Sequence, residues 1–363
     1  MLVPSIFGIS SIIMAAKGIK DGISAISNLS EAKDIINNAK SNYEREYEHT
    51  ASVIESFINQ DLAKIGEKKL EAMRLRERSI EIFSRLIEKL KVSDLELPDK
   101  NISVKDIVGE MKVERVQLVE GVKVLEGIVK SAGAAGLAYV GATGTAVAVG
   151  TASTGTAIAS LSGVAARNAI LAWFGGGSLA AGGGGMALGS IVLGGFVVAP
   201  ALMFGGMVLN KYSEEKLAEA KAYEAKIEAE LSKLRIIRNN INHSKKWLKI
   251  YSNTLDKLIN LTEKLINQLI IIEDKAHNYG VRRFLNLFHL SWLLNLFHLS
   301  RYSPTDEEKV VLKYLFIINR SLKEILEIDL IDNTGLYALK KGVEAKVEKL
   351  NKQIDEIIQE GVL

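Results

Sequence analysis

One stretch of the 363-residue chain, residues 131–210, carries a single charged residue, Arg167, and nineteen of the 30 glycines. The 46 basic and 43 acidic residues therefore lie almost entirely outside it. In water, each glycine inside a helix costs about 1 kcal/mol relative to alanine, so the stretch is unsuited to an exposed helix. In a bilayer, unpaired backbone groups are costly enough that such segments become helical. The stretch therefore predicts a membrane-active helical hairpin.

Small residues recur at steps of four in both halves of this stretch, which is the spacing that lets neighbouring helices approach closely in lipid. The residues of the two predicted ridges are Thr151, Gly155, Ala159 and Gly163 in the first half, and Gly185, Gly189, Ser190 and Gly194 in the second. Arg167 and Trp173 are predicted to lie at the hairpin tip, because a lone arginine at the bilayer centre costs about 2.5–3.5 kcal/mol and tryptophan favours the interface.

The lengths of the two halves lead to different expectations. Residues 186–209 are 24 residues, or roughly 36 Å of helix, which is enough for one tilted span of a hydrocarbon core about 30 Å thick. Residues 133–173 are too long for one span. We expect the first half to be partly buried in protein, kinked, or broken near Gly150, and the sequence leaves these alternatives open.

Two long stretches flank the hairpin, and their apolar residues recur every three or four positions. This periodicity predicts helices over 30–92 and 211–275 that pack side by side as coiled-coil rods. Residues 93–101 contain Pro98 and interrupt the first rod. A further helix is expected from about residue 103, and it shows no visible stop before the glycine-rich stretch. Rod regions are thus predicted at 30–130 and 211–275, after an apolar N-terminal segment at 1–29.

The last third of the chain is predicted to contain two more helical parts. Residues 284–300 are uncharged and contain LNLFHLS twice, so region 276–303 is expected to be an interfacial or core helix, too short to cross a bilayer. Region 304–363 is expected to be a helical hairpin, because Thr305 and Glu308 form a capping-box pattern after Pro304 and DNTG provides a turn. The predicted fold is all-α: an elongated coiled-coil helical bundle with a central glycine- and alanine-rich apolar helical hairpin.

Enzyme and cofactor motifs are absent from the sequence. GGGGMALG lacks the spacing of a dinucleotide-binding loop, no phosphate-binding P-loop occurs, and the chain has no cysteine. We predict no enzyme activity, no catalytic residue, no cofactor, no metal and no small-molecule substrate. A net charge of +3 is too small to indicate nucleic-acid binding. The histidines lack metal-binding spacing, and His289 and His298 are a hypothetical acid sensor if they lie at a membrane interface.

The layout of long helical rods around a central uncharged hairpin resembles the α-helical pore-forming toxins of the cytolysin A kind. This resemblance implies a soluble form that rearranges, inserts its hairpin and oligomerises around an aqueous lumen. The polar lining would come from small hydroxylated residues, namely Thr143, Thr145, Thr151, Ser153, Thr154 and Thr156. Separately, GTASTGTAIASLSGVAA through AWFGGGSLAAGGGGMALGSIVLGG looks like a segment of bacterial coiled-coil proteins of unassigned function.

The sequence therefore predicts a membrane-inserting helical protein that forms oligomeric pores. Its expected partners are the lipid bilayer and further copies of itself or related helical subunits. Two alternatives stay open: a membrane-anchored coiled-coil scaffold without pore activity, and a helical bundle that keeps the hairpin permanently buried. We expect membrane association, with a soluble cytoplasmic or released form. No clear signal peptide is expected, because no basic residue precedes the N-terminal apolar run.

Overall fold

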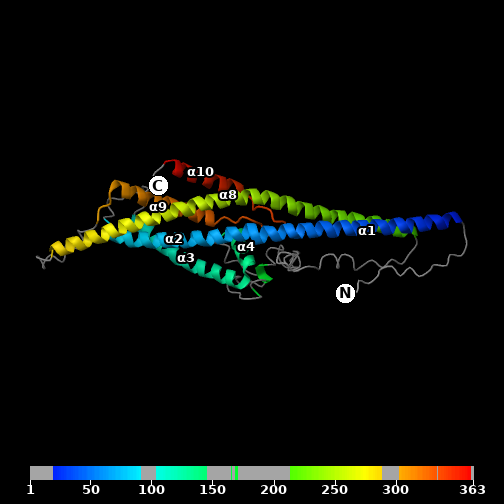
Figure 1. Ribbon diagram of the computed structural model, residues 1–363, viewed down its shortest axis with the longest axis horizontal. Coiled ribbons are helices and arrows are strands. Elements are labelled where there is room, and N and C mark those ends of the chain that lie inside the picture. The colour runs from blue at the N-terminus through cyan, green and yellow to red at the C-terminus, as the bar shows by residue number, and fades with distance from the viewer. Residues whose placement is uncertain are drawn as a thin grey trace. The chain divides into compact units, whose positions relative to one another are not determined.

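The computed structural model describes residues 19–90, 104–144, 165, 168–170, 213–287, 302–332 and 334–360. Every regular element in these residues is a helix, which confirms the predicted all-α helical bundle. The elements, labelled in Figure 1, are α1 (Ile19–Ser56), η1 (Phe57–Leu62), α2 (Ala63–Lys89), α3 (Val104–Ala132), α4 (Ala134–Ala142), α8 (Ser213–Leu287), α9 (Asp306–Leu326) and α10 (Val343–Gln359).

The chain divides into two compact units. One comprises residues 1–52 and 197–236, and its described parts belong to α1 and to the first part of α8. These two helices share an apolar cluster, which joins the two predicted long helical stretches. Its buried members are Ala39, Tyr43, Tyr223, Ile227 and Leu231. The rings of Tyr43 and Tyr47 stack with their centroids 5.9 Å apart.

The other unit comprises residues 53–196 and 237–363, and in it α2 and α8 run parallel and in register. Lys68 contacts Ser252 and Asp256, which lie 184 and 188 residues later in the chain. Near the end of α2, Lys89 and Arg85 both contact Glu273, again at separations of 184 and 188 residues. Because 184 and 188 differ by about one helical turn, the same register holds along both helices.

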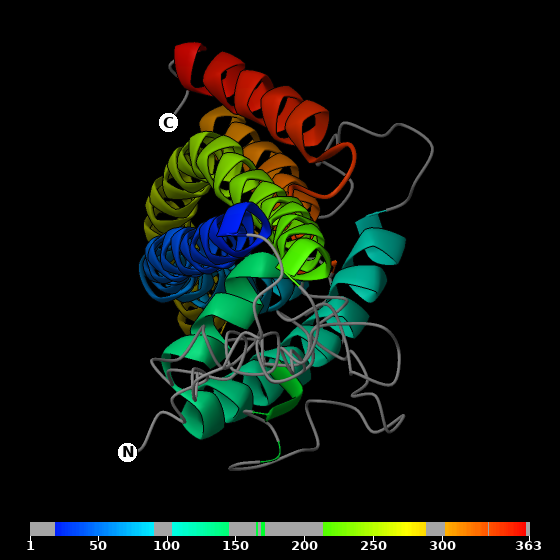
Figure 2. The same ribbon diagram turned by 90° about the vertical axis from the view of Figure 1, so that its right-hand side faces the viewer.

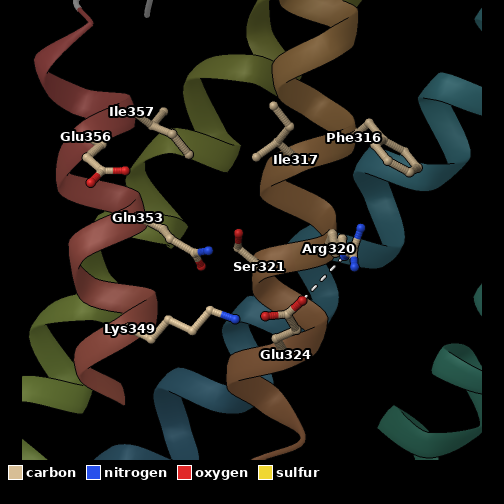
Figure 3. A pocket seen from close by; sticks show the side chains of 9 residues that line it. All are labelled: Phe316, Ile317, Arg320, Ser321, Glu324, Lys349, Gln353, Glu356 and Ile357. Atoms are coloured by element: carbon tan, nitrogen blue, oxygen red, sulfur yellow. Dashed lines mark hydrogen bonds and ion pairs between the residues drawn. The ribbon is translucent and has the colours of Figure 1, made fainter. Parts of the chain in front are cut away.

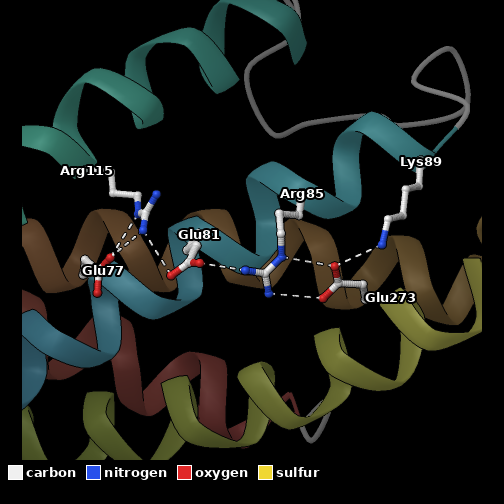
Figure 4. Close-up of polar contacts among 6 residues, drawn as sticks. All are labelled: Glu77, Glu81, Arg85, Lys89, Arg115 and Glu273. Carbon is white, nitrogen blue, oxygen red and sulfur yellow. Dashed lines mark hydrogen bonds and ion pairs between the residues drawn. The ribbon is translucent and has the colours of Figure 1, made fainter. Parts of the chain in front are cut away.

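Ion pairs connect α2 to the helices on either side of it. Figure 4 shows Arg115 of α3 reaching Glu77 and Glu81 of α2 at 3.0 and 3.1 Å. Farther along α2, Arg85 contacts Glu81 at 2.7 Å and Glu273 of α8 at 3.2 Å. Within this unit, Figures 1 and 2 show α3 and α4 on one side of α2, and α10 on the far side of α8. The bundle therefore presents α2 as its central helix.

The predicted capping box at the start of α9 is confirmed. The Thr305 hydroxyl accepts from the backbone N–H of Glu308, and the Glu308 carboxylate accepts from the backbone N–H of Thr305. Glu308 is buried, and its carboxylate also binds Lys275 of α8 at 2.9 Å. The cap thus ties the first turn of α9 to α8. The apolar face of α10 is also buried, at Val343, Val347, Leu350 and Ile354.

Thr305→Ala is expected to lower the free energy of unfolding by about 1 kcal/mol, because the N–H of Glu308 loses its side-chain acceptor. Urea denaturation followed by circular dichroism measures this change. Thr305→Ser is the matched control, since it keeps the hydroxyl and should retain most of the stability. Equal losses for Ala and Ser would show that the methyl group of Thr305, rather than the cap, matters.

The helix predicted to run without a visible stop into the glycine-rich stretch does enter it, and it ends after the first two residues of the stretch. Helix α3 ends at Ala132, and α4 begins only after Gly133, whose φ of 58° and ψ of −131° suit glycine alone. A single glycine in this backbone conformation thus ends the helix without any proline or turn cluster. A second unpredicted feature is the π-helical turn η1, which lies between α1 and α2.

None of the described helices combines the length and the hydropathy that a bilayer span requires. The described part of the predicted hairpin comprises residues 131–144, 165 and 168–170. In α4, seven of the nine residues are buried. Of the alternatives left open for the first half of the hairpin, burial in protein therefore applies to α4.

Candidate functional site at the start of the glycine-rich stretch

The predicted site residues all lie outside the described residues. They are Thr151, Gly155, Ala159, Gly163, Arg167, Trp173, Gly185, Gly189, Ser190 and Gly194. His289 and His298 also lie outside them, as do Thr145, Ser153, Thr154 and Thr156. Their roles stay predictions. Thr143 is described, and in this single chain it is buried with 2% of its surface exposed.

Helix α4 crosses α2 at a pair of glycines that bring the two backbones into contact. A Cβ atom on Gly66 would lie 1.9 Å from the carbonyl oxygen of Leu137, and one on Gly141 would lie 2.0 Å from that of Leu62. These distances are far below any van der Waals separation, so neither position has room for a side chain. The small residues of the glycine-rich stretch thus already serve as a helix contact inside the protein.

Two further glycines of the stretch lie against backbone on other sides of α4. A Cβ atom on Gly136 would lie 2.8 Å from the carbonyl oxygen of Ile128 in α3. One on Gly144 would lie 2.3 Å from the carbonyl oxygen of Glu327, just after α9. Helix α4 is therefore enclosed by α2, α3 and the C-terminal end of α9.

A buried lysine lies where the chain leaves α4. Lys69 of α2 has no exposed surface, and its Nζ donates to the carbonyl oxygens of Thr143 at 2.6 Å and Ile328 at 3.3 Å. The Nζ also lies 5.3 Å from the centroid of the Tyr251 ring in α8. Burial lowers the pKa of Lys69 to about 7, and the charge of Asp329 opposes this shift.

Asp329 and its neighbours hold the same end of α4 through hydrogen bonds. The Asp329 carboxylate accepts from the backbone N–H of Gly144 at 2.6 Å and from Lys340 at 2.5 Å. The carbonyl oxygen of Ala142 accepts from the backbone N–H groups of Leu330 at 2.8 Å and Ile331 at 3.2 Å. We call this arrangement the α4 junction, comprising Lys69, residues 142–144 and residues 328–331. It fastens the start of the glycine-rich stretch to the segment after α9.

The electrostatics of the α4 junction favour a donor at the position of Lys69. Its two carbonyl acceptors lie just after helix ends, since Thr143 follows the end of α4 at Ala142 and Ile328 lies two residues after the end of α9 at Leu326. Such carbonyls carry partial negative charge and lack partners within their own helix. The amine of Lys69 donates one hydrogen bond to the carbonyl group of Thr143 and one to that of Ile328. The arrangement is suited to holding two helix ends together, and it contains no nucleophile paired with a base.

Sequence reasoning missed Lys69, although a signal was present. Lys69 and Arg76 lie on the same face of α2 as Leu62, Ile65, Met73 and Ile80, which are all buried. A charged residue that interrupts an apolar stripe indicates a buried polar contact, because such a residue is rarely buried without partners. The identities of those partners follow only from the fold.

A separate groove of about 450 Å³ lies between α9 and α10 (Figure 3). Ile317 of α9 and Ile357 of α10 supply apolar surface, and Arg320 and Glu324 on its rim contact each other at 3.4 Å. Among the described residues, no cluster of His, Asp or Glu has a geometry suited to holding a metal ion. The groove therefore offers a surface but no recognisable chemistry.

Comparison with protein families, curated proteins and solved structures finds no match for this chain. The resemblance to pore-forming toxins stays an expectation drawn from the layout of the sequence.

Proposed function

We propose that this protein is a membrane-inserting helical protein that forms oligomeric pores, and that its bundle stores the glycine-rich stretch before insertion. The observation that carries this proposal is the burial of α4, the first helix of the stretch, through direct backbone contact at Gly66 and Gly141. The proposal assigns no enzyme activity to the chain. Its partners are a lipid bilayer and further copies of the chain or related helical subunits.

The physical basis of this proposal is that glycine allows two helices to pack closely both in a protein interior and in lipid. Close helix approach depends on small side chains, and this requirement is the same in a protein interior as in lipid. A stretch with almost no charge can therefore exchange protein neighbours for lipid neighbours without exposing an ionised group. The helix α4 itself is nine residues, or about 14 Å, so a span about 30 Å long must come from the residues that follow it.

A second candidate function is favoured by the same burial. Among the described residues of α4, Ala135, Ala138 and Ala142 have no exposed surface, as expected of a permanent core. In that case the protein is a helical bundle that keeps the whole stretch covered and acts through its outer surface. A membrane-anchored scaffold is a third candidate, and the dye-release experiment described next distinguishes it from the other two.

Dye release from liposomes tests the proposal, with the protein purified without detergent. We expect release by the parent and much weaker release by the double variant Gly155→Leu with Gly189→Leu, because bulky side chains block close helix approach. The matched control is Gly109→Leu with Gly127→Leu on α3. A Cβ atom at either position meets nothing within 4 Å, so this variant should release dye like the parent.

The remaining outcomes separate the alternatives. A parent that stays in solution without detergent and releases no dye at any pH or lipid composition contradicts pore formation and favours the covered bundle. A parent that needs detergent and releases no dye favours the anchored scaffold. Equal loss of release in both double variants would show that the effect comes from leucine substitution in general rather than from the predicted ridges.

A further inference from the structure

The buried amine of Lys69 joins two segments that are remote in the sequence. Its two carbonyl acceptors, on Thr143 and Ile328, lie 74 and 259 residues away along the chain. A neutral amine has two N–H groups, and each of the two carbonyl oxygens can accept a hydrogen bond from one of them. Among the residues that the structure describes, the third N–H of an ammonium group would face the ring of Tyr251, whose centroid lies 5.3 Å from the Nζ atom, instead of a further carbonyl oxygen.

Among the described residues, the charged and titratable groups around Lys69 come from α8, from α4 and from the segment after α9. On α8, the buried Tyr251 donates its hydroxyl to the carbonyl oxygen of Ile325 at 2.9 Å, and burial raises its pKa well above the usual value. On α4, burial and the charge of Asp329 raise the pKa of Tyr139 to about 12. After α9, Asp329 is bound to Lys340. Both tyrosines therefore stay neutral between pH 6 and 9, and the nearby carboxylate is already paired.

We infer that Lys69 is a proton-controlled clasp: its amine holds residues 143–144 against residues 328–329, and its protonation favours release of α4 from the bundle. The biological consequence rests on the proposed function, because release of α4 frees the start of the glycine-rich stretch. The clasp itself is a property of the α4 junction and exists without any membrane.

The direction of the pH effect follows from linkage. In the closed junction, burial lowers the pKa of Lys69 from 10.5 to about 7. Once the junction opens and Lys69 meets water, its pKa returns to the usual value, so opening takes up a proton. The ratio of open to closed molecules therefore rises as pH falls through the window between the two pKa values, by up to about tenfold per pH unit. Below pH 7 both states are protonated, and this dependence levels off.

The absence of cysteine from the chain makes opening directly measurable. Thr143→Cys introduces a single thiol at a position with 2% exposed surface, and it keeps the backbone carbonyl that Lys69 binds. The alkylation rate by iodoacetamide is measured from pH 6 to 9 and divided by the rate for the urea-unfolded chain at the same pH. We expect this relative rate to rise about tenfold per pH unit from pH 9 to 7 and to change little below 7.

Two substitutions in the Thr143→Cys background identify the titrating group. Lys69→Met removes both N–H donors, and it should make the relative rate independent of pH and about tenfold higher at pH 9. Lys68→Met is the matched control on the same helix, because Lys68 binds Ser252 and Asp256 of α8 instead. It should keep the pH dependence of the parent. A single thiol at Val347→Cys, buried on α10, should show no such dependence.

A pH dependence that persists in Lys69→Met, or that is absent from the parent, overturns the inference. If Lys69→Met does not fold by circular dichroism, Lys69→Arg replaces it, since arginine stays charged throughout this range and should also remove the pH dependence. The labelling experiment contains no lipid, so it is independent of dye release. If the relative alkylation rate depends on pH as expected but the protein releases no dye, only the proposed function is contradicted. If the protein releases dye but the relative alkylation rate does not depend on pH, only the clasp is contradicted.

Discussion

Gly66→Ala and Gly141→Ala are each expected to lower the free energy of unfolding by about 3 kcal/mol. The added Cβ atoms would lie 1.9 and 2.0 Å from backbone carbonyl oxygens, which cannot rotate away as a side chain can. The helices α2 and α4 must separate to make room, and this separation breaks the packing of Tyr139 and its neighbours in the core. Urea denaturation monitored by circular dichroism measures the loss.

Two glycines on α3 provide the matched controls for this prediction. At Gly109 and Gly127, an added Cβ atom meets nothing within 4 Å. Alanine at either position should raise the free energy of unfolding by about 0.5–1 kcal/mol, because it is the better helix former. If Gly141→Ala proved as stable as these controls, α4 would not lie against α2 in solution.

Glu114→Gln is the second substitution with a large expected effect. Glu114 of α3 binds Arg76 of α2 at 2.5 Å and also pairs with Lys323 of α9, so one carboxylate joins three helices. The side chain of Arg76 is only 8% exposed, and its other acceptor is the carbonyl oxygen of Asn319 at 3.2 Å. Glutamine leaves this buried cation without a counter-charge, and we expect a loss of about 3 kcal/mol in urea denaturation at pH 7.

An exposed pair between the same two helices is the control for Glu114. Arg74 of α2 binds Glu126 of α3 at 2.7 Å, but the side chain of Arg74 is 58% exposed. Glu126→Gln should therefore change the free energy of unfolding by less than about 0.5 kcal/mol. Equal effects of the two substitutions would show that burial of Arg76 does not determine the strength of its ion pair.

The pH dependence of the Glu114 effect has a definite sign. Burial opposes ionisation of Glu114, but hydrogen bonds and charges from Lys323 and Arg76 outweigh it and hold its pKa below the usual 4.5. The resulting stabilisation is complete above the unfolded-state pKa and is lost as pH falls through the lower pKa of the folded state. The difference in stability between the parent and Glu114→Gln should therefore shrink toward zero in acid.

The sequence predicted most of the helices because each depends on neighbouring residues. Apolar spacing predicted α2 and α8, and the capping box at Thr305 predicted the residue at which α9 begins. These signals are local: a helix face or a cap involves residues three or four positions apart. The end of α3 was not predicted, because only the backbone angles show that Gly133 is used as a stop.

The candidate site could not be predicted because its partners are remote in the sequence. Low charge and high glycine content suit a lipid environment and a protein interior equally, so composition did not reveal that α4 is buried. The contact of Gly66 with Gly141 exists only once α2 and α4 are placed together, and that of Lys69 with Ile328 exists only once the segment after α9 is placed against α2. The coiled-coil description and the helical hairpin at 145–210 stay predictions.

The parallel pairing of α2 with α8 also imposes an order of events during synthesis. Residues of α2 meet their partners on α8 only after another 184 to 188 residues have been translated. At about 5–20 residues per second, this delay lasts roughly 10–40 seconds. The glycine-rich stretch is translated within that interval, before α8 exists to complete the bundle. The face of α2 that will pack on α8 therefore stays without that partner throughout this interval.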